Sequence, residues 1–355
     1  MATLTETAYL TRKSVNIGLI ALTLLLVLWF SFKFAAGLWQ KVFPPPPPPA
    51  TVAFGKLPYP LAQNNIATPA GTINYSLETA TGGLPVMPKN MKILFMPHLG
   101  PSFGSFDRMK ALASKIGFPD SPNHPTRVGT TAWHFVDPVN PLHTIDIDEI
   151  STNFHLTYNY LSDLSLFSQK NFSSAENVIS SARSFFEGLG LFSPDLQSVD
   201  PTVTYFKLDS GTLVPTTSLS NADAIGVSFN RAEIEKISVV SPDPKQGQVS
   251  VLLSGASDSK KQILEGRYFY TAIDLENFAT YPVISAADAF EKLKSGAALF
   301  ASIQTPFPTQ VTIREVHLAY LDPYPPQSYL QPVLVFSDQK GFVAYVPVVS
   351  RDWLE

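Results

Sequence analysis

The chain contains no cysteine among its 355 residues, and this absence excludes several kinds of chemistry at once. Thiol nucleophiles, disulfide frameworks and Cys-ligated zinc or iron–sulfur sites all need cysteine. Charged residues are also scarce, at 15%, against roughly 25% in an average soluble domain. A cysteine-free chain with few charges is typical of an exported bacterial protein, which has no thiols to be oxidised outside the cell.

Concentrated positive charge is missing as well. The formal net charge is −4 and no run of lysine and arginine stands out, so we expect no nucleic-acid partner. The chain has neither a G-x-G-x-x-G nor a G-x-x-x-x-G-K-[ST] motif, no closely spaced histidine pair and no conspicuous pair of acids for glycoside hydrolysis. We therefore expect no cofactor, and the motifs do not favour an enzyme.

The N-terminal region carries the longest apolar stretch. Val15 to Phe32 are eighteen residues without a charge, and the apolar character resumes after Lys33. A span needs about 20 residues, whereas the apolar part of a secretory signal has about 7–15. We predict a cytoplasmic N-terminus over residues 1–13, a transmembrane helix over 14–39 and a large extracytoplasmic domain at the plasma membrane. Cleavage of a signal at Ala35 to Gly37 is the alternative.

Six prolines, Pro44 to Pro49, follow the predicted anchor. Proline cannot continue a helix, and in the polyproline II form it extends the chain by about 3 Å per residue. The run therefore predicts a semi-rigid spacer of about 19 Å within a linker over residues 40–57. Such a spacer would hold the rest of the chain away from the membrane.

The remaining chain alternates helical and strand-like patterns. Apolar residues at helical spacing predict helices over 105–116, 174–189 and 286–295, with capping boxes at Ser173–Glu176 and Ser285–Asp288 and a glycine after each helix. Alternating or β-branched runs predict the strands: 73–79, 92–96, 131–136, 143–149, 153–160, 203–208, 225–229, 234–240, 248–253, 267–273, 311–321, 331–336 and 342–348. This order indicates an α+β fold with helices packed on antiparallel sheets. We predict two modules, over 58–170 and 171–355.

The sharpest catalytic motif is Gly100-Pro-Ser102-Phe-Gly104, which matches G-x-S-x-G between a predicted strand and a helix. In a serine hydrolase this Ser102 would be the nucleophile, with an acid and a histidine later in the chain. The predicted strands form hairpins instead of alternating with helices. The favoured interpretation is therefore a turn that delivers a helix N-terminus, with Ser102 or Ser105 as its cap.

Asp146 and Asp148 lie two residues apart on a predicted strand, so both carboxylates are on one face. Two adjacent carboxylates are a weak candidate for a calcium site, although the glycine and bidentate glutamate of an EF-hand loop are missing. A half-exposed strand shows the same alternation without any metal. We favour that second interpretation.

A proline-rich connection near the C-terminus is a candidate contact loop. Asp322, Tyr324, Pro325 and Pro326 lie in this connection, between two predicted strands. Tyrosine is enriched at protein interfaces. These four residues are the sequence's candidates for contact with a partner.

Four segments carry a resemblance to a known family: YPVISAADAFEKLKSG (Tyr281 to Gly296), VTIREVHLAYLDP (Val311 to Pro323), YLQPVLVFSDQKGFVAYVPVV (Tyr329 to Val349) and KALASKIGF (Lys110 to Phe118). Together they resemble the YycH/YycI type of membrane-anchored bacterial regulator. The resemblance implies an N-terminal anchor, two PepSY-like modules and a function exerted by contact with a sensor histidine kinase. The six-proline spacer is not part of that family's pattern.

The sequence thus predicts a single-pass membrane protein whose extracytoplasmic α+β domain binds a membrane or envelope protein. Membrane lipid would surround its N-terminal helix. One alternative is an anchored serine hydrolase that uses Ser102, and another is a structural component of a cell-envelope assembly.

Overall fold

The computed structural model describes residues 18–19, 21–34, 49–60, 73–97, 100–119, 124–304 and 306–355. The chain divides into two units, Met1–Pro49 and Ala50–Glu355. In the first unit, residues 18–19 and 21–34 are helical. No helix among the described residues combines the length and the apolar character needed to cross a membrane. The remainder of the predicted span over 14–39, and all but the last of the six prolines, lie outside the described residues.

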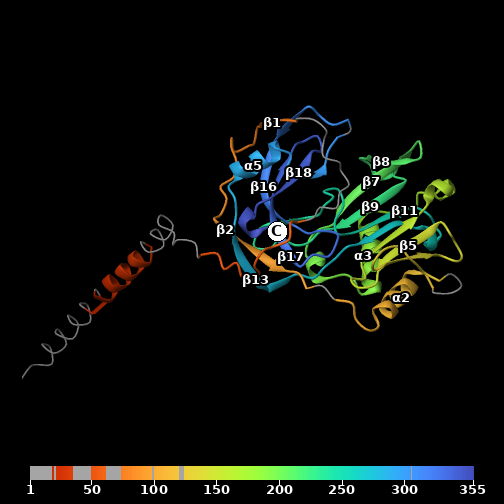
Figure 1. Ribbon diagram of the computed structural model, residues 1–355, viewed down its shortest axis with the longest axis horizontal. Helices are drawn as coiled ribbons and strands as arrows, with labels where there is room; N and C mark the ends of the chain where they lie inside the picture. Colours follow the sequence, from red (N-terminus) through yellow and green to blue (C-terminus); the bar gives the residue numbers. More distant parts are fainter. Residues whose placement is uncertain are drawn as a thin grey trace, which may run out of the picture. The chain divides into compact units, whose positions relative to one another are not determined.

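Two large sheets form the second unit (Figure 1). The nine-stranded sheet is antiparallel throughout. Its spatial order is β3 (Thr126–Arg127), β4 (Ala132–Val136), β5 (His143–Asp148), β6 (Phe154–Tyr158), β12 (Ile263–Tyr268), β11 (Val249–Ser254), β9 (Ala224–Phe229), β7 (Thr202–Asp209) and β8 (Thr212–Thr216).

The seven-stranded sheet contains most of the C-terminal strands. Its path is β10 (Ser238–Val240), β16 (Glu315–Leu321), β17 (Tyr329–Ser337), β18 (Val343–Pro347) and β14 (Leu299–Ser302), while β2 (Asn90–Phe95) pairs with both β17 and β13 (Asp274–Pro282). Within it, β10 and β16 are parallel. A separate parallel pair joins β1 (Asn74–Leu77) to β15 (Gln310–Ile313).

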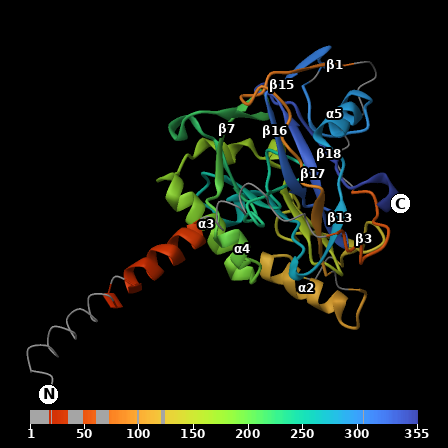
Figure 2. The same ribbon diagram turned by 90° about the vertical axis from the view of Figure 1, so that its left-hand side faces the viewer.

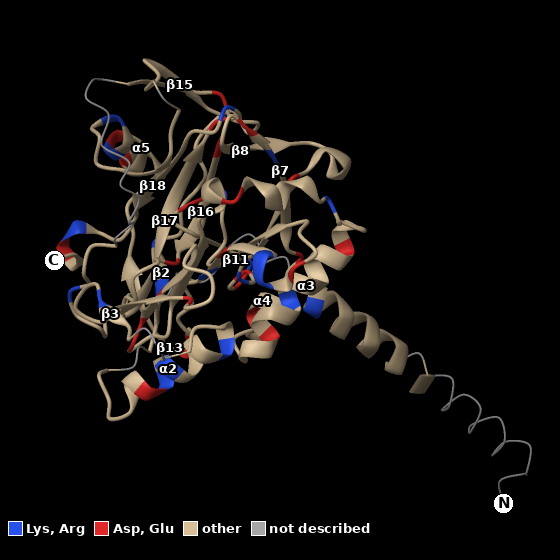
Figure 3. Ribbon diagram, turned by 90° about the vertical axis from the view of Figure 1, so that its right-hand side faces the viewer, with Lys and Arg blue, Asp and Glu red and all other residues tan. Residues whose placement is uncertain are grey.

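The three predicted helices are confirmed. They are α2 (Ser105–Ile116), α3 (Ala175–Leu189) and α5 (Ala286–Lys294), and a single turn, α4 (Pro194–Gln197), follows α3. The apolar faces of α2 and α3 bury residues in one core with the nine-stranded sheet, and α5 packs on β18 of the other sheet (Figure 2). Short 3-10 turns, η1 (Tyr160–Ser162) and η2 (Leu164–Ser168), follow β6. Lysine, arginine and acidic residues are interspersed over the folded unit, as on α2 (Figure 3).

The helix ends follow local chemistry, with one correction. The predicted capping box Ser285–Asp288 is present at the start of α5. At α3 the cap is Ser174, not Ser173, because the Ser174 side chain accepts the hydrogen bond from the backbone NH of Asn177. Gly190 ends α3 with a φ of 74°, a left-handed conformation that glycine adopts without strain.

Three strand predictions are wrong in their boundaries. The run 234–240 begins with a tight turn in which Glu235 and Lys236 have φ values of 51° and 69°, and only β10 is extended. The run 267–273 contains only the last two residues of a strand. This strand, β12, begins at Ile263 and ends at Tyr268. The run 311–321 is divided between β15 and β16 at Arg314.

The division of the chain at residue 170 does not match the construction of the sheets. β6 lies before this residue and β12 lies far after it, yet the two strands are neighbours in the nine-stranded sheet. The folded unit also begins at Ala50, inside the predicted linker 40–57. Leu57 is fully buried, and its backbone NH donates to the carbonyl of Trp353 over 2.8 Å.

Phe186 occupies the centre of the largest core. It is fully buried, and its ring centroid lies 6.1 Å from that of Phe229 and 6.3 Å from that of Tyr268. The aromatic cluster therefore joins α3 to the strands β9 and β12.

We predict that Phe186→Ala lowers the free energy of unfolding of the full chain in detergent by about 3–5 kcal/mol, because truncation leaves a cavity. Urea unfolding followed by tryptophan fluorescence measures this change. Phe103→Ala is the control, since that side chain is fully exposed. Equal effects of the two changes would show that Phe186 does not hold the core.

Candidate functional site between the sheets

A buried arginine joins the segments that cross between the two sheets. Arg231 follows β9 and is 4% exposed. It donates from Nε to Asp322, which follows β16 and is 1% exposed, and from Nη1 to Asp195 of α4 over 2.8 Å. Its Nη2 donates to the carbonyl of Thr271, and its guanidinium lies 4.0 Å from the ring centroid of Tyr270. We call Arg231, Asp195, Asp322 and Tyr270 the Arg231 cluster.

The electrostatics of the Arg231 cluster are those of a desolvated ion pair. Burial is the largest single effect and lowers the pKa of Arg231, but Asp322, Tyr270 and Asp195 together raise it, so the guanidinium stays protonated. Burial raises the pKa of Asp322, while the attraction of Arg231 opposes this rise. Tyr270 supports the second carboxylate by donating from its hydroxyl to Asp195 over 2.9 Å. The cluster thus fixes the position of groups from both sheets.

We predict that Asp322→Asn lowers the free energy of unfolding by about 3–5 kcal/mol, since it leaves a buried cation short of a counter-charge. The paired change Arg231→Met with Asp322→Leu should be less destabilising, because it removes both charges. Asp195→Asn should lower the free energy of unfolding less than Asp322→Asn does, because Asp195 is half-exposed. Urea unfolding of the three variants checks this ranking, and a paired change as harmful as Asp322→Asn would contradict it.

A groove of about 640 Å³ opens beside the Arg231 cluster, and we call it the inter-sheet groove. It is lined by Lys92, Leu94, Ser193, Pro194, Asp195, Arg231, Ala232, Glu233, Ile234, Glu235, Tyr270, Ala272, Ile273, Leu275, Glu276 and Phe278. These residues come from β2 and β13 of one sheet, from α4 and from segments that cross between the sheets.

The inter-sheet groove combines exposed apolar side chains with acidic ones. Leu275 is 57% exposed and Phe278 is 42% exposed. Lys92 forms an ion pair with Glu235, and its ammonium lies 4.3 Å from the ring centroid of Phe278. Exposed apolar groups gathered in a concave surface above a rigid base are typical of a contact site.

A row of polar side chains crosses the nine-stranded sheet on the face opposite α2 and α3. Each member is the direct cross-strand neighbour of the next: Thr126, His134, Asp146, His155, Arg267, Ser250, Ser228 and Thr202. We call these residues the polar row. Along each strand, the residues next to a member of the polar row point to the opposite face, which α2 and α3 cover, because successive side chains of a strand point to opposite faces.

Glu265 connects two members of the polar row. Its Oε1 is 2.9 Å from Nε2 of His155 and also accepts from Nε of Arg267. Burial raises the pKa of Glu265, but the hydrogen bond from His155 and the charge of Arg267 together lower it below 4.5. This carboxylate is therefore ionised and already engaged by two partners at neutral pH.

We predict that Glu265→Gln lowers the stability of the protein at pH 7 by about 1–2 kcal/mol, the scale of a hydrogen bond to a charged group. Because the folded state has the lower pKa, this contribution is present above pH 4.5 and is lost as the pH falls below it. Unfolding of both proteins between pH 7 and the acid limit of folding measures the difference. A difference that stays constant with pH would contradict the assignment.

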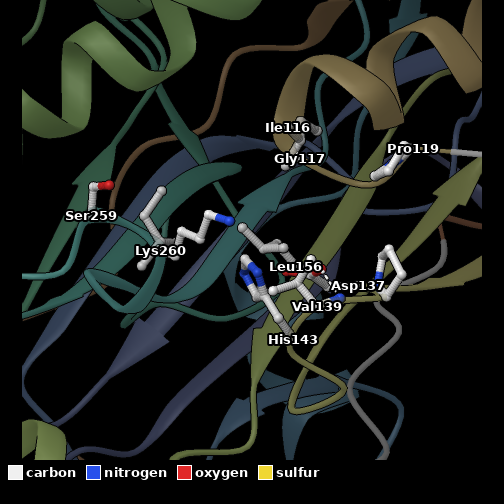
Figure 4. Close-up of a pocket in the computed structure, with 11 residues that line it drawn as sticks. Ile116, Gly117, Pro119, Asp137, Val139, His143, Leu156, Ser259 and Lys260 are labelled. Carbon is white, nitrogen blue, oxygen red and sulfur yellow. Dashed lines mark hydrogen bonds between the residues drawn. The ribbon is translucent and has the colours of Figure 1, made fainter.

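A second cavity, of about 350 Å³, lies beneath the end of α2 (Figure 4). His143, Asp137 and Lys260 line it, and Figure 4 shows Lys260 between Ser259 and the imidazole of His143. Burial lowers the pKa of His143, with Asp137 opposing the shift, so the imidazole is neutral at pH 7. Its Nε2 is buried and has no hydrogen-bond partner within the described part of the chain.

Ser102 lies before α2, and its surroundings differ from those of a hydrolase nucleophile. Its Oγ is 3.0 Å from Oγ of Ser105 and accepts from Nη2 of Arg108 over 2.9 Å. β2, the strand before it, pairs antiparallel with both neighbours, whereas the G-x-S-x-G turn of hydrolases follows a parallel strand. The prediction that Ser102 or Ser105 caps α2 is wrong, since Gly104 occupies the N-cap and no side chain caps the helix.

Asp146 and Asp148 face away from the buried Ile145 and Ile147, but different partners engage them. Oδ1 of Asp146 is 2.7 Å from Nδ1 of His134 in the polar row. Asp148 accepts from Thr131 and from the backbone NH of Ser151 over 2.7 Å, which closes the turn after β5. Among the residues that the structure describes, no group of three or more potential metal ligands is found.

The predicted contact loop is partly interior. Asp322 belongs to the Arg231 cluster, so it does not present its carboxylate to a partner. The ring of Tyr324 packs against Phe269, with centroids 5.0 Å apart. Pro325 is half-buried and Pro326 is exposed. The sequence therefore located a segment that borders the candidate site, while its acidic residue acts inside the fold.

Sequence patterns did not reveal Arg231, Leu275 or Phe278. Arg231 meets Asp322 across 91 positions of sequence, so no local motif marks the pair. One local signal was available: an arginine two residues after the buried strand β9, in a chain with few charges. Leu275 and Phe278 lie on β13, whose first residues, Asp274-Leu-Glu-Asn, do not show the sequence pattern of a strand.

Comparisons with known proteins supply no family. No protein-family model matches the chain, and no curated protein matches it. Among solved structures, a similar chain is an uncharacterized protein from Eubacterium rectale, with 13% sequence identity and a TM-score of 0.39 over 73% of this chain and 82% of that one. The candidate site therefore rests on the residues of this chain alone.

Proposed function

We propose that the protein is a single-pass, membrane-anchored extracytoplasmic binding protein that acts by contact with another membrane or envelope protein. The partner docks in the inter-sheet groove, where it covers Leu275 and Phe278. The N-terminal apolar segment serves as the anchor and the proline run as the stalk. The sequence resemblance to YycH/YycI-type regulators favours a sensor kinase or an envelope enzyme as the partner.

The observation that carries this proposal is the inter-sheet groove itself. Two large apolar side chains stay exposed there, although Arg231 and Asp322 beside them are buried and bond to each other. A rigid base with exposed apolar groups reduces the ordering that binding requires. A groove of this kind supports protein contact better than it supports catalysis, for which it lacks a nucleophile paired with a base among its lining residues.

The position of β13 supports a partner close to the membrane. Thr280 of this strand accepts from the backbone NH of Val52, only three residues after Pro49. Phe278 of the groove is two residues earlier on β13, about 7 Å away along the strand. The groove thus lies on the strand to which the first residues after the proline run are bonded, and this supports a partner in the same membrane.

Site-specific photo-crosslinking in intact membranes tests the proposal. A photoreactive residue replaces Leu275 in one strain and Leu161 in another, because the two leucines are 57% and 55% exposed. We expect a discrete crosslinked protein from position 275 and none from position 161. Equal capture at both positions, or none at either, would overturn docking at the groove.

The hydrolase alternative has its own measurement. We expect Ser102→Ala to leave the crosslinking pattern unchanged, because Ser102 is outside the groove. Esterase and peptidase assays of the purified full chain accompany this variant. An activity that disappears with Ser102→Ala while the fold is retained would contradict a function by contact alone.

A further inference from the structure

A hollow of about 220 Å³ lies on the face of the nine-stranded sheet that carries the polar row. We call it the sheet-face hollow, and its lining residues are Tyr160, Thr204, Phe206, Leu213, Gly226, Ser228, Lys245, Gln246, Ser250, Val251, Leu252 and Glu265. It is separate from the inter-sheet groove, with which it shares no lining residue.

Small residues on two central strands create the space. Gly226 and Ser228 of β9 and Ser250 of β11 lie on this face, whereas Val227 and Val251 belong to the core on the other side. Ser228 and Ser250 are direct cross-strand neighbours. A Cβ on Gly226 would lie 3.1 Å from the ring of Phe206, so Phe206 packs over the glycine, and the short side chains of Ser228 and Ser250 leave the space beside that ring.

The hollow contains hydrogen-bonding groups that the protein does not use. Ser228 and Ser250 are each 8% exposed, and neither hydroxyl has a hydrogen-bond partner within the described residues. Oε1 of Gln246 is also buried without a partner there. An unsatisfied buried polar group costs about 1–3 kcal/mol, and among these three groups this cost applies to Gln246. The hydroxyls of Ser228 and Ser250 keep accessible surface, so both can bond to an occupant of the hollow.

The remaining walls define the character of that occupant. Tyr160 and Phe206 offer aromatic surface, and Leu213 adds an apolar edge. The carboxylate of Glu265 is already engaged by His155 and Arg267, so it does not call for a cation. Lys245 also lines the hollow but is an exposed residue, so water solvates its charge. The other donors and acceptors are neutral and lie with aromatic surface, which suits a neutral molecule with hydroxyl groups on its edge and C–H groups on its faces.

We propose that the sheet-face hollow binds one pyranose ring of a neutral sugar. Its hydroxyls bond to Ser228, Ser250 and Gln246, and its C–H face lies against Tyr160 and Phe206. The volume of 220 Å³ is below the range of about 300–1,000 Å³ of sites for drug-sized ligands, which agrees with a single ring. This assignment does not depend on the docking of a protein at the inter-sheet groove.

Ligand-detected NMR with methyl glucoside and N-acetylglucosamine tests the site. The full chain is held in a detergent without a sugar headgroup, so that the detergent does not compete. We expect saturable binding that Ser228→Val and Ser250→Val each weaken about tenfold, the equivalent of about 1.4 kcal/mol. Thr202→Val is the matched control, because Thr202 belongs to the polar row but does not line the hollow.

Each outcome decides the question. Failure of both sugars to bind the folded protein, binding unaffected by either serine variant, or stronger binding of charged glucuronate would overturn the proposal. Thermal unfolding of each variant establishes that it is folded. Sedimentation with insoluble cell-wall glycan then separates the two sources of the sugar: co-sedimentation supports a ring at a polymer end, and binding of monosaccharide alone supports a free sugar.

Discussion

The pairing of Arg231 with Asp322 is the constraint on which the arrangement of the two sheets depends. The chain passes between the sheets several times, since β10 and β13 belong to one sheet while β9, β11 and β12 belong to the other. Arg231 lies in the segment that leaves the nine-stranded sheet after β9. It donates to the carboxylate of Asp322 at the end of β16 and to the carbonyl of Thr271, which lies in a later segment between the sheets. A buried ion pair adds little net stability, but breaking it is severe, so it specifies one arrangement of the crossings over others. Arg231 and Asp195 line the inter-sheet groove, so the arrangement of these segments also determines the shape of the groove.

The two faces of the nine-stranded sheet differ in composition. One face carries large apolar residues that pack against α2 and α3 and supply most of the largest core. The other face carries the polar row, in which every direct cross-strand neighbour is polar from β3 to β7. Because a strand alternates its side chains, the residues that fill the core do not determine those on the second face. Ser228 and Ser250 lie on that second face of central strands, where they border the sheet-face hollow.

Sequence reasoning succeeded where the physics is local. The helices α2, α3 and α5 were predictable because their apolar spacing and glycine stops lie within a few residues of each other. The predicted cap of α3 is one residue too early, because Ser173 and Ser174 both carry a hydroxyl that could cap the helix. The sheets were not predictable in the same way, because β6 and β12 meet across a hundred residues. For the same reason Asp322 was expected at a surface: nothing near it in sequence shows that Arg231 will cover it. Asp146 was predicted on the correct face, but its partner His134 follows only from the strand register.

The start of the folded unit and the inter-sheet groove share one strand. The last proline, Pro49, is followed at once by residues that belong to the fold, and Leu57 pairs with Leu354 near the C-terminus in a parallel bridge. Val52 and Thr51 bond to Thr280 on β13, the same strand that presents Phe278 in the inter-sheet groove. The first residues of the folded unit are therefore hydrogen-bonded to the strand that carries Phe278. Because the backbone of β13 is continuous between Thr280 and Phe278, a substitution that loosens the bond to Thr51 or Val52 acts on the same strand as one in the groove.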